Sequence, residues 1–407
     1  MKIAKIKWTY YRRYKVTISF ITDQITPVTK FFIEQVVDYW NTNQPNRPVN
    51  LTFIDHEELR DSLENYLTQT NPPDVLTWFA GNRMKSFIER KLMLNTESIK
   101  GIETFYESLQ PRFQKMFDKG DAQYFIPTSY FWWAIYYRPS VFRQAGINMP
   151  INSWHELTVA AEKLRSIGIV PFSLGSRYRC PAVAWFDYLN MRLNGPEFHQ
   201  QLMDLKIPYT DARIKTVLSF FRKLQRNDWF IGKANSYDEE EAVATVLNGK
   251  AGMTLIGSYV QDEYLPPDYI EELDFFRFPI INENVAIGED TPIDGFFAAG
   301  HSINLQDSGD FLLHLGSRNV QTLATKLITA LPTRSDINIG NRSDLAKGKE
   351  IIDRASNLFQ FYDLDTPWEI ADVGMALINN FANYEADEST VQHCIEDARL
   401  RFLGNFN

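Results

Sequence analysis

The sequence predicts an α/β protein in which two bodies of mostly parallel β-sheet are each flanked by helices. Three observations support this fold class. Short segments of alternating apolar residues recur between longer segments of helical periodicity. The same strand–helix order occurs near the start and in the middle of the chain, and 407 residues exceed one typical domain. Repeated β-α-β order favours a parallel sheet covered by helices.

The first strand and helix are predicted near the N-terminal end. Val16, Ile18 and Phe20 alternate with polar residues, which is typical of a strand. Thr26 can then cap a helix, and Pro27 takes the first helical position, where its missing N–H has no helical partner to lose. The sequence therefore predicts a strand that leads directly into a helix.

Two further strands follow in the same order. Pro45 and Pro48 interrupt the first helix, and alternation resumes at residues 49–53. Asp55 can cap a second helix, after which residues 75–79 form the next predicted strand. This β-α-β-α-β order predicts a sheet whose strands run in the same direction.

The middle of the chain repeats the pattern. Ser153 and Glu156 form a capping box at the start of a helix, and residues 169–174 are predicted as the strand that follows it. A later helix with acidic residues in its first turn leads into a strand at 251–256. Two α/β bodies fit this order, but periodicity alone does not assign the late strands to one body or the other.

Charge and composition exclude several classes of protein. The formal net charge is −9 and the pI is near 5.3, whereas nucleic-acid binding depends on a basic face that displaces counterions. We therefore expect no nucleic-acid partner. The longest aromatic stretch, at residues 130–137, is shorter and more polar than a membrane-spanning helix of about 20 apolar residues. We expect the folded body to be soluble.

The N-terminal segment and the cysteines say little about the compartment. Residues 1–15 are basic like the start of a signal peptide, but Trp8 and Tyr10 lie where its apolar segment belongs, so no signal peptide is predicted. Cys180 and Cys394 leave open one disulfide or two buried thiols. The redox compartment is not determined by the sequence.

Four segments together carry a resemblance to a known family. Each is common by itself, but four in one order at compatible distances are far more specific. They resemble the bacterial ABC-transporter extracellular solute-binding proteins of carbohydrate-binding family 1, which are similar to maltose-, glycerol-phosphate- and glucose-binding proteins. The resemblance covers nearly the whole chain from Val16. The segments are NPPDV at 71–75, YFIPTSYFWWAIYY at 124–137, LNGKAGMTLI at 247–256 and LPTR at 331–334.

The resemblance implies the type II periplasmic binding protein-like fold, with two lobes joined at a hinge and a ligand cleft between them. The family pattern places the crossings between lobes near residues 130–138, 277–297 and 331–341. The implied division is a basic extension at 1–15, an N-terminal lobe at 16–129 plus 297–335, and a C-terminal lobe at 130–296 plus 336–407. Because carboxyl ends of parallel strands gather at one sheet edge, ligand contacts should lie on loops that follow strands.

The resemblance also implies a function. We expect the sugar-binding component of an ABC importer, which captures a small carbohydrate by hinge closure and delivers it to the transmembrane subunits of a permease. Such a protein is no enzyme and needs neither cofactor nor metal. We expect a monomer in the periplasm or outside the cell, in free or lipid-associated form, although no signal peptide is seen.

A pyranose ring offers apolar C–H faces and a rim of hydroxyl groups. A site for it combines flat aromatic side chains with carboxylate, amide or guanidinium groups that hydrogen-bond to the rim. Residues of both kinds follow the predicted strands or lie at the implied crossings. The candidate ligand-binding residues are Asp23, Gln24, Trp78, Phe79, Asn82, Tyr130, Trp132, Arg177, Tyr178, Trp185, Tyr259, Asp294 and Arg334.

The aromatic candidates are ranked by strand alternation. Trp78 is the preferred aromatic platform, and its neighbour Phe79 should point to the opposite face. In the aromatic run before the first crossing, alternation sends Tyr130 and Trp132 to one side and Trp133 to the other. We rank Tyr130 and Trp132 above Trp133 for the cleft.

Polar candidates have structural alternatives. Asp23 can accept sugar hydroxyls or cap the turn before the first helix, and the aromatic residues common in this loop of the family are absent. Arg177 can reach hydroxyl groups or a ligand carboxylate. Tyr259, after two small residues, is the strongest candidate in the C-terminal lobe. Asp294 and Arg334 either contact the ligand or pair with each other across the hinge.

Two other functions remain open. His56-Glu57 begins a zinc-protease motif, but Arg60 stands where the second histidine is required, so the motif predicts no metal site. Acidic residues are plentiful, so a secreted glycosidase with two facing carboxylates is an alternative that counting residues does not exclude. A protein that senses the same ligand for a membrane receptor is the other alternative.

Overall fold

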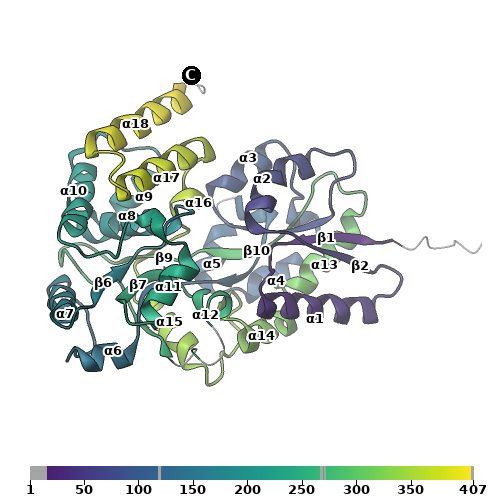
Figure 1. Ribbon diagram of the computed structural model, residues 1–407. Coiled ribbons are helices and arrows are strands. Elements are labelled where there is room, and N and C mark those ends of the chain that lie inside the picture. Colours follow the sequence, from purple (N-terminus) through teal and green to yellow (C-terminus); the bar gives the residue numbers. More distant parts are fainter. Residues whose placement is uncertain (1–15, 118–120, 266–268, 270–271, 405–407) are drawn as a thin grey trace, which may run out of the picture.

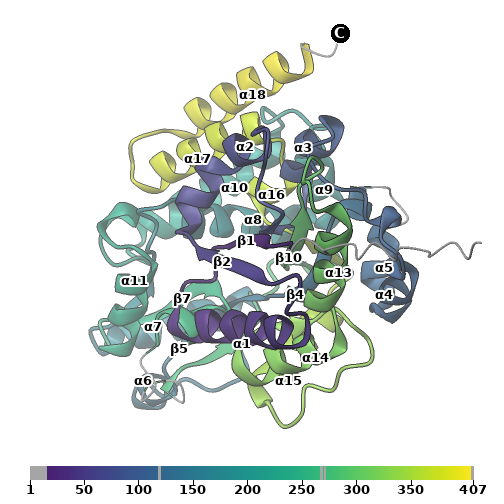
Figure 2. The same cartoon turned by 90° about the vertical axis from the view of Figure 1, so that its right-hand side faces the viewer.

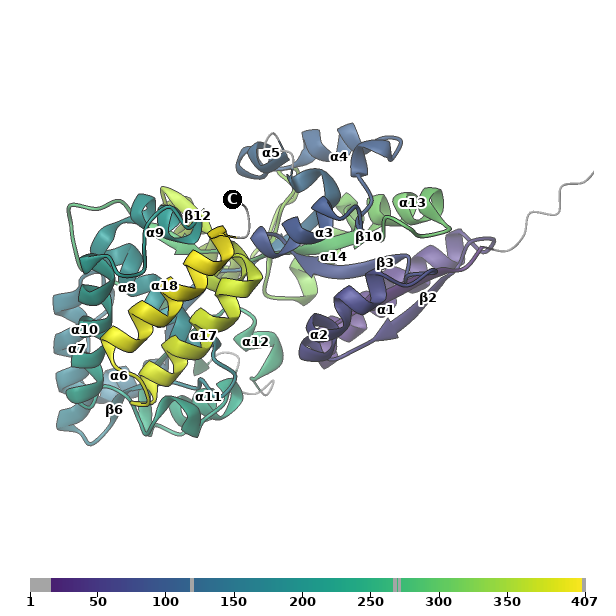
Figure 3. The same ribbon diagram turned by 90° about the horizontal axis from the view of Figure 1, so that it is seen from above.

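The computed structural model describes residues 16–117, 121–265, 269 and 272–404, and the basic extension predicted at 1–15 lies outside them. The described chain forms two lobes, each built around its own β-sheet (Figures 1 and 3). Helices flank both sheets. The predicted α/β class with two helix-covered sheets is confirmed.

The first lobe contains a six-stranded sheet in the order β11-β4-β10-β3-β1-β2. Strand β1 pairs in parallel with β2 and β3, whereas β10 and β11 pair antiparallel with their neighbours. Four of the six strands therefore run in one direction. The strands are β1 (Ile18–Thr22), β2 (Val49–Phe53), β3 (Val75–Phe79), β4 (Ile126–Tyr130), β10 (Ile293–Ala298) and β11 (Leu331–Pro332).

Helices cover both faces of this sheet. Figure 2 shows α1 on one side of β1 and β2, and α2 on the other. The predicted caps form, since Thr26 Oγ1 accepts from Thr29 N and Asp55 Oδ1 accepts from Glu57 N. The helices are α1 (Pro27–Asn43), α2 (His56–Leu67), α3 (Lys85–Glu89), α4 (Ile102–Ser108), α5 (Pro111–Phe117), α13 (Leu305–Leu315) and α14 (Arg318–Leu327), with 3₁₀ turns η1 (Asn82–Met84), η2 (Thr96–Ser98) and η3 (Asp121–Tyr124).

The second lobe contains a four-stranded sheet in the order β6-β7-β5-β8 and a separate two-stranded sheet of β12 and β9. Strands β6 and β7 are parallel, and β5 runs antiparallel to both β7 and β8. Three of the four strands thus share a direction. The strands are β5 (Trp133–Tyr137), β6 (Val170–Ser173), β7 (Ala251–Gly257), β8 (Asp274–Phe276), β9 (Gly288–Asp290) and β12 (Asn357–Phe359).

The helices of the second lobe include the one predicted with a capping box and the one predicted from acidic residues in its first turn, and both begin with a capping box. Ser153 and Glu156 cap each other's backbone at the start of α7, and Asp238 and Glu241 do so at α11. The helices are α6 (Pro139–Gln144), α7 (Trp154–Ser166), α8 (Cys180–Asn194), α9 (Pro196–Met203), α10 (Ala212–Arg226), α11 (Glu239–Leu247), α12 (Val260–Glu263), α15 (Ser343–Asp353), α16 (Tyr362–Asp365), α17 (Trp368–Ala382) and α18 (Glu388–Gly404), with one 3₁₀ turn, η4 (Ala234–Ser236).

Within the described residues, the chain passes between the lobes three times. It crosses through residues 131–132 between β4 and β5, through 291–292 between β9 and β10, and through 333–342 between β11 and α15. Strands β5 and β10 enter their sheets directly from the other lobe, whereas β11 follows α14 of the first lobe and leads into the third crossing; these three strands run against their neighbours. This is why pairing is mixed where the sequence predicted mostly parallel sheets.

One predicted lobe boundary is misplaced by several residues. The sequence predicted that the C-terminal lobe ends at residue 296 and that the N-terminal lobe resumes at 297. However, all of β10 pairs with β3 and β4 in the first sheet. Residues 293–296 therefore belong to the first lobe, and so does Tyr130, the last residue of β4. The family pattern places a crossing only approximately, whereas the observed crossings at 131–132 and 291–292 are two residues long. The other predicted boundaries remain predictions.

Both Cys180 and Cys394 are free thiols.

Candidate ligand-binding cleft

The edges of the two sheets at the crossings carry the loops that face each other. In the first sheet these are the loops after β1, β2 and β3, next to the start of β10. In the second sheet, Trp133 at the start of β5 pairs with Gly257 at the end of β7. Loops after parallel strands of both sheets therefore converge on the region between the lobes, as the physical argument from sequence predicted.

The first lobe contributes a histidine between carboxylates and an aromatic ring. His56, the first residue of α2, places Nδ1 2.7 Å from Asp23 Oδ2. Its ring centroid lies 6.3 Å from that of Phe79 at the end of β3. Asp294 pairs with Phe79 in the register of β10 and β3. Among the described residues, no hydrogen-bond partner is found for the buried Asp23 Oδ1, so this oxygen is free to accept from a ligand.

The electrostatics of this group favour a charged histidine beside a protonated carboxyl. Partial desolvation between the lobes lowers the pKa of His56, but the hydrogen bond and charge of Asp23 outweigh it and raise the pKa to about 9. Burial and the negative charge of Asp23 raise the pKa of Asp294 to about 7, against the opposing charge of His56. Asp294 can therefore donate or accept a hydrogen bond near neutral pH.

The second lobe contributes an aromatic group around one carboxyl. Tyr259 Oη donates to Glu239 Oε2 at 2.9 Å, and Tyr264 Oη lies 3.3 Å from the same oxygen. Trp133 stacks on Phe361, with ring centroids 5.3 Å apart, and meets the edge of Tyr259 at 6.0 Å. Flat rings and a carboxyl therefore occupy one small region of this lobe.

Glu239 is electrostatically linked to the first lobe. Burial raises its pKa to about 7, opposed by the hydrogen bonds of Tyr259 and Tyr264 and by the positive charge of His56. The charge of His56 thus acts across the gap between the lobes. We call Asp23, His56, Phe79, Asp294, Trp133, Glu239, Tyr259 and Phe361 the inner cluster.

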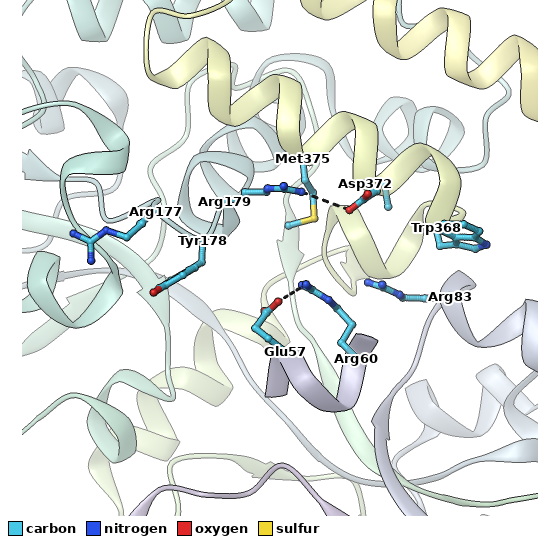
Figure 4. A pocket seen from close by; sticks show the side chains of 10 residues that line it. Glu57, Arg60, Arg83, Arg177, Tyr178, Arg179, Trp368, Asp372 and Met375 are labelled. Atoms are coloured by element: carbon cyan, nitrogen blue, oxygen red, sulfur yellow. Dashed lines mark ion pairs between the residues drawn. The ribbon is translucent and has the colours of Figure 1, made fainter. Parts of the chain in front are cut away.

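A cavity of about 290 Å³ lies between the lobes beside the inner cluster, close to the lower end of the usual range for small-molecule sites. Figure 4 shows Glu57 and Arg60 of α2 facing side chains that come from the loop before α8 and from α17. Each arginine that lines the cavity has a carboxylate partner, so the cavity is polar but has no strong excess of positive charge. Its lining comprises Glu57, Arg60, Arg83, Arg177, Tyr178, Arg179, Trp368, Ala371, Asp372 and Met375.

Two polar contacts join the lobes near this cavity. The amide of Asn82 donates to the backbone oxygen of Asp365, and Arg83 Nη1 lies 3.6 Å from Asp363 Oδ2. Asn82, a predicted ligand residue, is therefore engaged with the opposite lobe. Gly81 approaches that lobe so closely that a Cβ there would lie 2.3 Å from Leu364 O.

Seven other predicted residues lie at or near the cleft. Asp23, Phe79, Tyr259 and Asp294 belong to the inner cluster, and Arg177 and Tyr178 line the cavity. Gln24, half-buried, follows Asp23 and donates its N–H to Thr22 Oγ1. Arg177 does not point freely to a ligand, because its guanidinium pairs with Asp238 at 2.8 Å and Glu241 at 2.7 Å.

The aromatic ranking from alternation is wrong at the first crossing. Trp132 is fully buried, lies 5.5 Å from Phe275, and packs so tightly on α15 that a Cβ on Gly348 would lie 2.5 Å from its ring. Trp133 is the residue in contact with Tyr259. The two-residue link between β4 and β5 interrupts the strand, so alternation does not carry across it.

Three more predicted residues face elsewhere. Tyr130 is fully buried, its ring lies 4.9 Å from Phe113, and it lines a second cavity of about 220 Å³ that Arg334 also lines. Arg334 pairs with Asp336 at 2.8 Å, which replaces the predicted pair with Asp294. Trp185 lies in the core of the second lobe, because every turn of α8 is buried.

Trp78 and Phe79 stack on each other with centroids 4.3 Å apart. Trp78 also contacts Phe87, on the side of α3, whereas Phe79 contacts His56. The ring that reaches the inner cluster is therefore Phe79, the smaller of the two, and not Trp78, which the sequence favoured. Both side chains are largely buried. Trp78 remains a prediction as a ligand contact.

The sequence reasoning missed His56, Trp133, Glu239 and Phe361. His56 was weighed only as part of a metal motif, yet it follows strand β2, where ligand contacts were expected. Glu239 was read as a favourable charge at the N-terminus of α11. Phe361 gave no signal, because only the folded chain brings the segment before α16 beside Trp133.

Two lobes that present facing loops and a polar, aromatic-lined gap define a ligand-binding protein of the two-lobed receptor type. The model of the bacterial extracellular solute-binding protein family matches residues 23–298. The chain belongs to this family, whose members are binding receptors of ABC transporters, as its four sequence segments indicated.

Individual relatives agree with the family. An uncharacterized ABC transporter extracellular-binding protein of Pyrococcus horikoshii is 25% identical over 280 residues, which are 68% of this chain and 62% of that one. The bacterial solute receptor AcbH, described as having an exclusive preference for β-D-galactopyranose, superposes with a TM-score of 0.85 and 24% identity over 97% of this chain and 100% of its own. The acarbose-binding GacH receptor of Streptomyces glaucescens gives 0.78 and 16%, over 96% and 99%.

These structural matches confirm the type II periplasmic binding protein fold that the sequence predicted. The family is extracellular. In the part of the chain that the structure describes, no helix has both the length and the apolar character that spanning a membrane requires.

Proposed function

We propose that this protein captures a carbohydrate between its two lobes, closes around it, and delivers it unchanged to the transmembrane permease of an ABC importer. The proposed site of action is outside the cytoplasmic membrane. The observation that carries the proposal is the composition of the inner cluster, where carboxyl groups from both lobes face one another beside stacked aromatic rings.

The rings and the carboxyl groups suit different parts of a pyranose. Phe79, Trp133 and Phe361 offer apolar surfaces for C–H faces. Asp23 and Glu239 place oxygen atoms at the rim, where charge-assisted hydrogen bonds from hydroxyl groups are strong. The sugar-binding structural neighbours, AcbH with galactopyranose and GacH with acarbose, support a carbohydrate as the ligand class.

Closure follows from the division of the cluster between lobes. Asp23, His56 and Asp294 come from the first lobe, whereas Glu239 and Tyr259 come from the second. A ligand that contacts both groups binds the closed form better than the open form, and it shifts the equilibrium by that difference in affinity. The permease would then recognise the two lobes in their closed arrangement.

Calorimetric titration with a sugar panel tests the ligand class. D-galactose, maltose, chitobiose and xylobiose represent monosaccharides and different linkages. We expect saturable binding of at least one sugar, and mass spectrometry should recover that sugar intact after prolonged incubation. Cleavage of the sugar would favour the alternative of a glycosidase that uses Asp294 and Glu239, whose pKa values near 7 suit proton donors.

Small-angle X-ray scattering tests closure. The radius of gyration should be smaller at saturation with the bound sugar than without it, or unchanged only if the sugar-free protein is already closed. The double variant Asn82→Ala, Arg83→Ala separates these cases, because it removes the two polar contacts that join the lobes beside the cavity and so favours the open form without sugar. If this variant shows no compaction with saturating sugar, hinge closure is refuted.

A further inference from the structure

A group of buried ligating side chains lies in the second lobe, away from the inner cluster. Asp187 of α8, His199 of α9 and Asp290 of β9 bring one carboxylate or imidazole atom each to within 4.8 Å of the others. Each of these three residues exposes at most 1% of its surface to solvent. Two consecutive helices and a strand much later in the chain thus meet at one point, and Asp290 is the last residue before the crossing at 291–292.

The carboxylates of this group lack the partners that buried charges require. Within the described part of the chain, neither oxygen of Asp290 has a hydrogen-bond partner, and Asp187 has one, the N–H of Tyr362 at 3.0 Å on Oδ2. A buried carboxylate is stable only when it is paired, hydrogen-bonded, protonated or bound to a metal. With so few hydrogen bonds, Asp187 and Asp290 must therefore either be protonated or share a cation with the imidazole.

The nearest guanidinium does not supply that charge. Arg192 donates through Nη2 to Glu289, through Nε to Phe278 O at 3.2 Å and through Nη1 to Gly288 O at 2.5 Å. Arg192 thus uses three of its five N–H groups on Glu289 and the backbone, and its single positive charge is matched by the carboxylate of Glu289. Where Asp187 and Asp290 are ionised, their charges are left to another cation.

We propose that Asp187, His199 and Asp290 bind a divalent cation of the Zn²⁺ class. Two carboxylate oxygens and one imidazole nitrogen match the ligands of Zn²⁺, whereas Ca²⁺ and Mg²⁺ select oxygen ligands alone. In a tetrahedral site, ligand atoms lie roughly 3.4 Å apart, so side-chain movements of about 1 Å close the observed group around an ion.

Asn190 is the positioning residue of this site. Its Nδ2 lies 3.0 Å from His199 Nδ1, and its Oδ1 accepts from Asn194 Nδ2 at 2.8 Å. With both amides turned by 180°, Asn190 Oδ1 accepts from His199 Nδ1–H, which fixes the ring tautomer and leaves the Nε2 lone pair for the cation. The bound ion cross-links α8, α9 and the crossing at 291–292, and it thereby stabilises the second lobe and the hinge.

Titration of the full chain with metal chlorides tests the site. Protein treated with EDTA and then dialysed is titrated with ZnCl₂, MnCl₂ or CaCl₂ in a calorimeter and heated in a scanning calorimeter. We expect one equivalent of Zn²⁺ to bind more tightly than Ca²⁺. At a free Zn²⁺ concentration of about 100 times the dissociation constant, the melting temperature should rise by roughly 5 °C.

Three variants assign the binding to these residues. Asp187→Asn and Asp290→Asn should each weaken Zn²⁺ binding by at least ~100-fold, and Asn190→Ala by about 10- to 100-fold. Matched controls are Asp61→Asn and His393→Gln, which change exposed side chains outside the group and should leave binding unchanged. If an Asp variant does not fold, the comparison of Zn²⁺ binding by His199→Gln and by the wild-type protein decides whether the group binds the ion.

Two results overturn the proposal. One is the absence of stoichiometric Zn²⁺ binding by the wild-type protein, which assigns the charge balance to protons or water. The other is Zn²⁺ binding that all of the site variants retain, which assigns it to surface side chains. Because no sugar enters these measurements, their outcome is independent of the proposed carbohydrate function.

Discussion

Gly81 offers a direct test of how closely the two lobes approach each other. It follows β3 in the first lobe with φ of +128° and ψ of −176°, a conformation that is essentially restricted to glycine. A Cβ at this position would lie 2.3 Å from Leu364 O in α16 of the second lobe. The substitution Gly81→Ala therefore strains the backbone and forces the lobes apart at one defined point.

The size of the effect follows from these distances. The obstructing atom is a backbone oxygen, which cannot rotate away as a side chain can, and it must move by about 1 Å to reach an ordinary contact of 3.4 Å. The conformation of residue 81 alone costs about 1–3 kcal/mol for alanine. This backbone cost falls on the open and closed forms alike and so reduces stability, whereas the clash with Leu364 O falls on the closed form alone. A clash of about 1.4–2.8 kcal/mol decreases sugar affinity about 10- to 100-fold, at 1.4 kcal/mol for each factor of ten.

Titration calorimetry with the sugar identified in the panel measures this loss of affinity, and X-ray scattering measures the separation of the lobes. Gly101→Ala is the matched control, because Gly101 has φ of +90° in the first lobe but a methyl group on its Cα would meet no atom within 4 Å. The control should lose stability without losing affinity. If Gly81→Ala binds sugar within about twofold of wild type, the close approach at Leu364 plays no part in closure.

Two further predictions concern the inner cluster. Trp133→Leu should weaken sugar binding at least ~10-fold by calorimetry, because its ring lies between Tyr259 and Phe361. The raised pKa of Asp294, about 7 against 3.8 ordinarily, means that the folded state holds a proton which the unfolded state releases. Stability should therefore fall between about pH 4 and 7, by at most ~1.4 kcal/mol per pH unit, and Asp294→Asn should flatten this dependence in urea unfolding.

Each of these two predictions has an internal control. Trp132→Leu removes an adjacent buried indole that packs on α15, so it should reduce stability while sugar affinity stays within about twofold. Equal losses of affinity for the two tryptophan variants would contradict the placement of Trp133 in the site. For Asp294, a wild-type stability that rises from pH 4 to 7 as steeply as that of Asp294→Asn would show that this carboxyl is ionised throughout.

The sequence by itself determined the elements and the family. Alternation predicted strands at residues 16–22 and 49–53, and the capping residues Thr26, Asp55 and Ser153 marked helix starts that the structure shows. These signals are local, because a cap or an alternating strand depends only on residues a few positions apart. Four ordered segments were then enough to predict the two-lobed fold and a cleft formed by loops after strands.

Only the tertiary structure decided which side chains face that cleft. The two-residue crossing reversed the predicted ranking of Trp132 and Trp133 as cleft residues. Trp132 packs on Gly348 and belongs to the core. Glu239 meets Tyr259 across the strand that separates them, and Phe361 approaches Trp133 from a segment far along the chain. Periodicity specifies the face of one element, whereas a binding site depends on how several elements are oriented relative to one another, and that orientation is set by long-range packing.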